Sequence, residues 1–280
     1  MDMAKALAAL GSMFMETVAD VRAAIMEADY RRERQITPWI GIPTTSGTGS
    51  EVTCWATVWD QEKGEKYSLS DPRLYADAAV ILPELTYTMP TRLSVSTALD
   101  ALCHATEAYW SVKTNPLTRM YALQAIRFIC TVLPRLKEEP SNREFRRQLS
   151  LASLYAGLAF SNTETTACHA ISYPLTLGHG ITHGIAASFT LSSVLKINQR
   201  SLLDSEQLFA AFGVECAEEV AQVMKRIYQD YGIPDRLQAF GITPSHIQEI
   251  AYQASTHGRM DNNPVKLSPS QIENMLRALL

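Results

Sequence analysis

Residues 76–112 read ADAAVILPELTYTMPTRLSVSTALDALCHATEAYWSV, and the character of the chain changes within this stretch. Residues 76–82 are a short apolar run stopped by Pro83, which is typical of a buried strand. After Pro90, residues 95–112 fit a helix, and no proline or glycine interrupts them. We therefore predict an α/β part that ends near residue 90, followed by an all-helical part.

The segments on either side extend this division. Residues 4–28 favour a helix, and residues 39–42 form an apolar run before Pro43 that predicts another buried strand. Residues 52–59 are rich in β-branched and aromatic side chains, and residues 66–70 are expected to pair with them across the turn at EKGEK. Beyond residue 90, further helices are predicted over residues 117–137, 143–160, 185–197, 217–231, 246–254 and 269–280.

The composition excludes several classes of protein. Hydrophobic residues make up 46% of the 280 residues, enough for a substantial core, and the net charge of -4 gives no basic surplus for nucleic acid. No apolar run is long enough to span a bilayer, and Asp2 argues against a signal peptide at the start. The five cysteines contain no CxxC pair, so we expect reduced thiols in a cytoplasmic protein without a nucleic-acid or membrane partner.

Asp100 and His104 are the first candidates for chemistry. Residues four apart lie on one face of a helix, so this carboxylate and imidazole can converge on one point, as ligands of zinc or iron do. Alone, the pair more often indicates a hydrogen bond or a solvated face. Glu107 could be a third ligand, but an exposed helix residue is the better interpretation.

A second candidate is the histidine cluster in CHAISYPLTLGHGITHG. His169, His179 and His183 are half of the six histidines of the chain. Because Pro174 and two glycines should interrupt a continuous helix, two of these histidines can approach one site from different elements. Satisfied core histidines are the alternative.

The third candidate is the loop PTTSGTGSE over residues 43–51, which follows a predicted strand. Small residues allow a close approach of the backbone, and free N–H groups with hydroxyls can hold phosphate or ribose oxygens. No GK[ST] ends the loop, so it is not a Walker A motif. An ordinary polar turn fits the composition equally well.

Taken together, IPTTSGTGSEVT, DALCHATEAY, HAISYPL…HGITHG and the ending HGRMDNNPVKLS closely resemble the iron-type alcohol dehydrogenases, in the family's order and at nearly its spacing. The resemblance implies a Rossmann-like domain over residues 1–90, incomplete at its start, and a helical metal- and substrate-binding domain over residues 91–280, with the site in the cleft between them. It implies that the metal ligands are Asp100, His104, His169 and His183, so that His179 falls outside the set. It implies that the cofactor contacts are Asp2, Thr44, Thr45, Thr48, Thr53 and Lys66.

Two features depart from the family pattern. The family's GGGS turn, which binds the pyrophosphate, would precede Met1, because Asp2 and Lys5 resemble its DxAK stretch. Tyr173 stands where many members carry a histidine close to the nicotinamide, and we expect it to take part in catalysis. The string HAISYPLT is similar to the branch that reduces phosphonoacetaldehyde to 2-hydroxyethylphosphonate in phosphonate biosynthesis.

The resemblance therefore predicts a metal-dependent reductase of an aldehyde, with Fe(II) or alternatively Zn, and with NAD or NADP. The best substrate hypothesis is phosphonoacetaldehyde, and a simple small alcohol or diol is the alternative. A phosphonate would need donors, for which Arg259, Lys266 and the pair Asn262 and Asn263 are candidates. A further alternative is an inactive metal-binding fragment that lacks the pyrophosphate-binding half. The expected partners are a small aldehyde or alcohol and, in a homodimer, a second copy of the chain.

Overall fold

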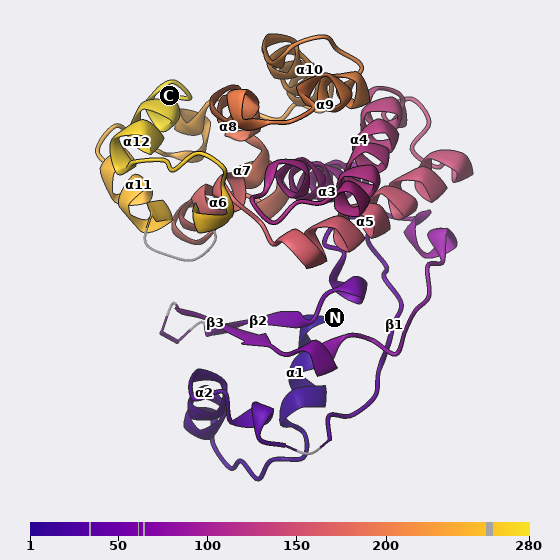
Figure 1. The fold of residues 1–280 in the computed structure, drawn as a ribbon, viewed down its shortest axis with the longest axis vertical. Coiled ribbons are helices and arrows are strands. Elements are labelled where there is room, and N and C mark those ends of the chain that lie inside the picture. The colour runs from indigo at the N-terminus through magenta and orange to yellow at the C-terminus, as the bar shows by residue number, and fades with distance from the viewer. Residues whose placement is uncertain (34, 61, 64, 256–259) are drawn as a thin grey trace. The chain divides into compact units, whose positions relative to one another are not determined.

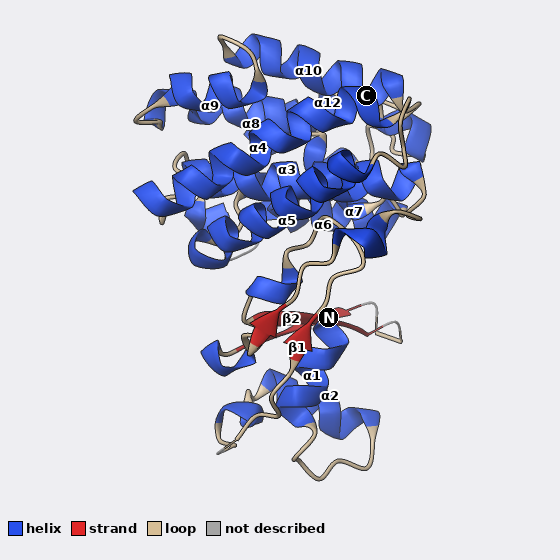
Figure 2. Ribbon diagram, turned by 90° about the vertical axis from the view of Figure 1, so that its right-hand side faces the viewer, coloured by secondary structure: helices blue, strands red, loops and turns tan. Residues whose placement is uncertain are grey.

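The chain folds into two units of different composition. A computed structural model describes the chain except for residues 34, 61, 64 and 256–259. It also does not describe the side chains of residues 65 and 66. The N-terminal unit comprises Met1–Thr44 and Gly49–Leu82, and the helical unit comprises Thr45–Thr48 and Pro83–Leu280. Every strand that the structure describes lies between residues 40 and 79, as Figure 2 shows by colour. The predicted fold class, an α/β part followed by a helical part, is confirmed.

Among its described residues, the N-terminal unit has two α-helices and two small sheets. Its elements are α1 (Asp2–Leu10), α2 (Val18–Met26), β1 (Ile40–Gly41), β2 (Trp55–Asp60), β3 (Glu65–Ser70) and β4 (Ala78–Ala79). Strands β2 and β3 form the predicted antiparallel hairpin, with Trp55 opposite Ser70 and Asp60 opposite Glu65. Strands β1 and β4 pair in parallel over two residues each. The strands predicted at residues 39–42 and 76–82 therefore exist, but they are shorter than expected. Their expected burial is wrong, because Ile40, Ala78 and Ala79 are exposed.

The single helix predicted over residues 4–28 is wrong, because the chain forms two helices there. Helix α1 ends at Gly11, and Thr17 starts α2 through a capping box. The Thr17 hydroxyl accepts from the backbone N–H of Asp20, and the Asp20 carboxylate accepts from the backbone N–H of Thr17. Such a reciprocal pair satisfies two N–H groups that a helix start otherwise leaves unbonded.

Lys5 is the most unusual residue of the N-terminal core. Its side chain is fully buried, and its ammonium group donates to the hydroxyls of Ser50 (3.0 Å) and Thr53 (2.8 Å) and to the carbonyl of Trp55 (2.9 Å). Burial disfavours the charged form and lowers the pKa of Lys5 from 10.5 to about 8. Lys5 thus fastens α1 to the end of the TTSGTGS loop (residues 44–50) and to the residues that follow it.

The helical unit is built around α3 (Thr91–Trp110), which is buried along most of its length. Figure 1 shows α3 in the middle of this unit, and it packs against α4, α5 and α7. The other helices are α4 (Pro116–Leu136), α5 (Arg143–Thr163), α6 (Ala167–His179), α7 (His183–Ser188), α8 (Leu191–Asn198), α9 (Ser205–Phe212), α10 (Ala217–Asp230), α11 (Ile247–Ser255) and α12 (Pro269–Arg277). Within the described part of the chain, no helix is both long and apolar enough to cross a membrane.

Two sequence expectations about this unit are wrong. Helix α6 runs through Pro174 without a break, and it ends only at Gly180 with a left-handed backbone (φ 66°). The helix predicted over residues 185–197 is divided into α7 and α8, and α9 was not predicted at all.

The short segment Thr45–Thr48 is fastened to the helical unit. The hydroxyls of Ser46 and Ser150 lie 3.2 Å apart, which joins the segment to α5. A Cβ on Gly47 would lie 2.6 Å from the Cβ of Thr97 on α3, so only glycine permits this approach. Gly47 thereby lies against α3 one turn before Asp100.

Candidate metal centre

Helix α3 presents Asp100 and His104 one turn apart in the interior of the helical unit. The two residues are 4% and 6% exposed. The imidazole of His104 stacks between the rings of Phe160 and His169, with centroid distances of 4.1 Å and 4.3 Å. The i, i+4 spacing predicted that the two residues share one face of the helix, and the structure shows that this face is buried.

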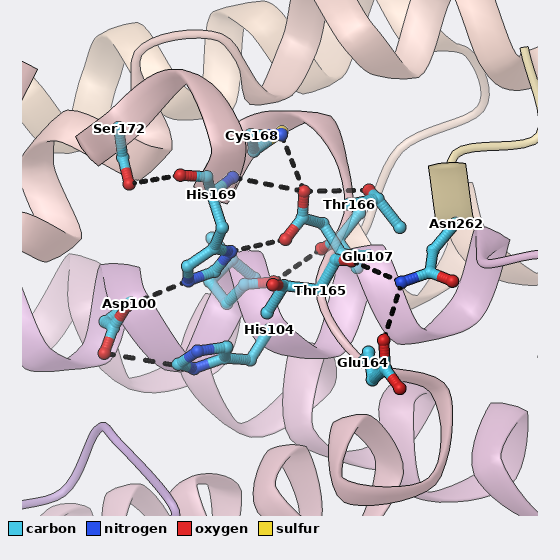
Figure 3. A network of polar contacts seen from close by, with 12 residues as sticks. Asp100, His104, Glu107, Glu164, Thr165, Thr166, Cys168, His169, Ser172 and Asn262 are labelled. Atoms are coloured by element: carbon cyan, nitrogen blue, oxygen red, sulfur yellow. Dashed lines mark hydrogen bonds and ion pairs between the residues drawn. The ribbon is translucent and has the colours of Figure 1, made fainter. Parts of the chain in front are cut away.

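Helices α6 and α7 bring the other two predicted ligands to the same place. Nε2 of His169 lies 3.3 Å from Oδ1 of Asp100, and Nε2 of His183 lies 3.7 Å from the same oxygen. One ligand atom from each of these three residues lies within 4.8 Å of the other two. The predicted convergence therefore occurs for Asp100, His169 and His183. Figure 3 shows His104 and His169 on either side of Asp100.

The close approach of α7 to α3 depends on glycine at position 184. A Cβ at this position would lie 1.9 Å from the carbonyl oxygen of Ser96 and 3.0 Å from the Cβ of Asp100. No side chain fits there, so the residue that follows His183 has to be glycine. The dipeptide HG of the motif thus combines a candidate ligand with the backbone contact that places it.

The charges in this cluster are strongly coupled. Burial alone would raise the pKa of Asp100, but the surrounding histidines, His104 foremost, hold it well below the usual range. Burial lowers the pKa of His104 to about 3, so this imidazole is neutral at pH 7. Burial also acts to lower the pKa of His169, but Glu107 and Asp100 outweigh it and raise the value to about 9. A carboxylate surrounded by imidazoles is a donor set that divalent transition metals prefer.

The donor set also has the spacing that a metal ion requires, and it includes one nitrogen that no hydrogen bond occupies. Ligand atoms about 2.0 to 2.2 Å from one ion in a tetrahedral arrangement lie roughly 3.3 to 3.6 Å apart. The distances of 3.3 Å and 3.7 Å from Asp100 to the two imidazoles are close to this range. Nδ1 of His104 is buried and has no hydrogen-bond partner, although Oδ2 of Asp100 lies 3.9 Å away. The cluster therefore fits a divalent ion, and ligation by these four residues stays a prediction.

The interpretation of Glu107 as an exposed helix residue is wrong. Its side chain is fully buried, and its carboxylate accepts hydrogen bonds from α6 and contacts Nδ1 of His169. Positions 100, 104 and 107 follow the i, i+4, i+7 pattern of one helix face. This spacing could have predicted that Glu107 shares the interior face of the two candidate ligands.

Tyr173 and His179 lie at different distances from the cluster. The ring of Tyr173, which is half-buried, stacks on His183 with a centroid distance of 5.7 Å. His179 lies against His246 instead, with a centroid distance of 5.1 Å. This placement agrees with the exclusion of His179 from the ligand set, and a catalytic role of Tyr173 stays a prediction.

The predicted cofactor contacts are divided between the two units. Thr44 and Thr53 belong to the N-terminal unit, whereas Thr45 and Thr48 belong to the helical unit. Thr53 is 1% exposed, and its hydroxyl is engaged with Lys5.

Asp2 is also engaged within the N-terminal unit. Its carboxylate accepts from the Ser50 hydroxyl (2.8 Å) and from the backbone N–H of Thr57 (2.9 Å). Asp2 and Thr53 thus form hydrogen bonds within the N-terminal unit, with Ser50 and Thr57 for Asp2 and with Lys5 for Thr53. The side chain of Lys66 lies outside the described residues. Contact of these six residues with a cofactor stays a prediction.

The proposed phosphonate anchors receive little support. Asn262 is buried and donates to the Glu164 carboxylate (3.0 Å), while the Asn263 amide pairs reciprocally with that of Asn198 (2.9 Å). Both side chains are therefore occupied by internal hydrogen bonds. Lys266 is exposed, and Arg259 lies outside the described residues.

Comparison with known proteins identifies the family. Residues 94–280 match the Fe-containing alcohol dehydrogenase family, C-terminal, and residues 1–83 match iron-containing alcohol dehydrogenase. The chain belongs to the iron-containing alcohol dehydrogenase family, whose members are enzymes, as its motifs predicted.

Individual relatives are about 30% identical to this chain over the aligned residues. The chain is 31% identical to phosphonoacetaldehyde reductase of Streptomyces viridochromogenes, over 85% of this chain and 62% of that protein. It is 33% identical to long-chain-alcohol dehydrogenase 1 of Geobacillus thermodenitrificans, over 88% of this chain and 64% of that protein. Sulfoacetaldehyde reductase from Bifidobacterium kashiwanohense, solved in complex with NAD+, matches with a TM-score of 0.88 at 30% identity, over 99% of this chain and 73% of that chain. The chain thus spans somewhat less than two thirds of the length of these two curated relatives.

Proposed function

We propose that this protein is a metal-dependent, NAD(P)-linked oxidoreductase that interconverts an aldehyde and a primary alcohol. The observation that carries the proposal is the buried meeting point of Asp100, His169 and His183, beside the unpartnered Nδ1 of His104. A carboxylate buried among imidazoles is costly unless its charge is compensated, and Nδ1 of His104 is buried without a hydrogen-bond partner. A bound divalent ion would compensate all four residues at once.

The residues of the cluster would have separate tasks. Asp100, His104, His169 and His183 would hold Fe(II), with Zn(II) as the alternative. When bound, such an ion supplies a Lewis acid that polarises a carbonyl oxygen. The His183 side chain is 38% exposed whereas those of Asp100 and His169 are nearly inaccessible, so substrate would approach on the side of His183. Tyr173, stacked on His183, would contact the substrate there and pass a proton to its oxygen.

The nicotinamide cofactor would be bound through the TTSGTGS loop. Thr45 and Thr48 lie in the segment that packs on α3 next to Asp100, and backbone N–H groups with hydroxyls suit ribose and phosphate oxygens. The cofactor, NAD or NADP, supplies the hydride, and the protein supplies its orientation.

The substrate that we favour is phosphonoacetaldehyde, which would place the protein in phosphonate biosynthesis in the cytoplasm. Two relatives named above are reductases of aldehydes that carry an anionic phosphonate or sulfonate group. The string HAISYPLT, with Tyr173, supports the same branch. A simple alcohol or diol is the second candidate, because long-chain-alcohol dehydrogenase 1 is equally similar and Asn262 and Asn263 are occupied by internal bonds.

The test is a comparison of substrates on the metal-loaded chain. The purified protein is loaded with Fe(II) or Zn(II), and oxidation of NADH and NADPH is followed with phosphonoacetaldehyde, propanal and 3-hydroxypropanal. The proposal predicts a higher kcat/KM for the phosphonate than for either neutral aldehyde. Faster reduction of the neutral aldehydes would transfer the assignment to a simple alcohol dehydrogenase. Metal binding without reduction of any aldehyde would leave the metal-binding fragment as the correct description.

A further inference from the structure

Glu107 is fully buried and touches the metal cluster, but it is not one of the proposed ligands. Its Oε1 accepts three hydrogen bonds from the start of α6: from the Thr166 hydroxyl (2.8 Å), from the backbone N–H of Cys168 (2.6 Å) and from that of His169 (3.3 Å). The Thr166 hydroxyl in turn accepts from Nε1 of Trp110 (2.7 Å). The carboxylate is therefore held in a fixed orientation from both helices.

The second carboxylate oxygen faces the imidazole of His169. Oε2 of Glu107 contacts Nδ1, while Nε2 on the other side of the ring lies 3.3 Å from Oδ1 of Asp100, and Figure 3 shows the ring between the two carboxylates. Three donors on Oε1 favour the ionised form, and an ionised carboxylate can only accept. Nδ1 therefore keeps its proton when a metal ion displaces the other one, and the neutral imidazole that ligates the ion presents its lone pair at Nε2.

We propose that Glu107 is a positioning residue that fixes the tautomer and the orientation of His169, so that Nε2 is available to a divalent ion. The inference rests on the proposed metal function. Metal-binding histidines commonly donate their second N–H to a carboxylate, which sets the ring orientation and makes the ligating nitrogen more basic.

The substitution Glu107→Gln separates positioning from packing. The glutamine oxygen has to take the place of Oε1, because two backbone N–H groups point there and cannot be turned away. The amide nitrogen then faces Nδ1 of His169 and donates to it. Nδ1 must accept, so the imidazole proton moves to Nε2, which then points a hydrogen at Asp100 and cannot ligate. The shape of the side chain and its bonds to α6 are retained.

The experiment uses Co(II) as the probe of the metal-free chain, with affinity and visible absorption as readouts that do not depend on catalysis. We expect Glu107→Gln to bind Co(II) about 10- to 100-fold more weakly than the wild type and with an altered spectrum. Tyr228→Phe is the matched control, because it removes a buried 2.8 Å bond to Ser188 that involves none of the candidate ligands. It should lower the melting temperature and leave the Co(II) affinity and spectrum unchanged.

The wild-type protein provides a test that does not require a folded variant. With 15N-labelled histidine and Zn(II), the nitrogen resonances of His169 should show a protonated Nδ1 and a metal-bound Nε2. The reverse assignment overturns the proposal, and so does a Glu107→Gln protein that binds Co(II) like the wild type. In both cases the metal function stands, whereas a wild-type chain that binds neither Co(II) nor Zn(II) overturns both proposals.

Discussion

The substitution Gly184→Ala tests how the metal cluster is assembled. The added methyl group would lie 1.9 Å from the carbonyl oxygen of Ser96 and 2.9 Å from the backbone nitrogen of Asp100. Both atoms belong to the backbone of α3, so no side chain can turn aside. Helix α7 has to move away from α3, and His183, the residue before the substitution, moves with it.

The size of the effect follows from these distances. Real Cβ contacts are essentially never shorter than 3.0 Å, so the carbonyl of Ser96 and residue 184 must separate by about 1 Å. Such overpacking costs about 1 to 3 kcal/mol of stability. A misplacement of about 1 Å at a chemical site can cost about 100-fold. Because a 100-fold factor corresponds to about 2.8 kcal/mol, we expect a loss of metal affinity that is similar in free energy to the loss of stability.

The assay measures Co(II) affinity and the free energy of unfolding for Gly184→Ala and for the matched substitution Gly178→Ala. A methyl group on Gly178 would meet no atom within 4 Å, and this residue lies inside α6 with an ordinary helical backbone. Gly178→Ala should bind Co(II) like the wild type and gain about 0.5 to 1 kcal/mol of stability. Wild-type affinity in Gly184→Ala would refute the argument that the approach of α7 to α3 places His183.

Two further predictions concern Lys5 and Tyr173. The pKa of Lys5 is about 8 in the folded chain, and its ordinary value is 10.5. Between these pH values the folded chain therefore binds fewer protons than the unfolded chain. The free-energy cost of burying the charge decreases as the pH rises through this range. Relative to Lys5→Met, the wild-type free energy of unfolding should therefore rise by roughly 2 to 3 kcal/mol from pH 8 to pH 10.5. Urea titration followed by tryptophan fluorescence measures this. A difference between the two proteins that stays constant with pH would contradict the prediction. Tyr173→Phe should lower kcat by about 100-fold at unchanged metal content. Tyr252→Phe, at an exposed site, is the control and should have no effect. Equal rates in the two variants would show that Tyr173 takes no part in the mechanism.

The fold class could be predicted because the hydrophobic pattern changes period near residue 90. Long helices such as α4 and α5 were found within a few residues of their ends, since their starts carry good caps at Asn115 and Asn142. The break between α1 and α2 was missed, although Thr17 and Asp20 form a recognisable capping box. Helix α6 was missed for a different reason. Pro174 lacks a backbone N–H and therefore disfavours the interior of a helix. The packing of α6 against α7 and α11 outweighs this cost.

The candidate site was predictable where its residues share one helix and unpredictable where packing decides. The spacing of Asp100 and His104 gives their common face directly, and the same rule applied to Glu107 would have placed it inside. The approach of α7 to α3 has no local signature. It depends on the absence of a side chain at Gly184, which a sequence shows only as an ordinary glycine.

The proposed metal ligands and the predicted cofactor contacts are distributed differently over the two units. Asp100, His169 and His183 all belong to the helical unit, so the proposed metal binding would depend on the packing of α3, α6 and α7. The predicted cofactor contacts, by contrast, are shared between the units, with Thr44 on one side of the division and Thr45 on the other. A change confined to the N-terminal unit should therefore weaken cofactor binding before it affects the metal. The buried network of Lys5 is the place where such a change would act first, because it ties α1 to the end of the TTSGTGS loop and to the residues that follow it.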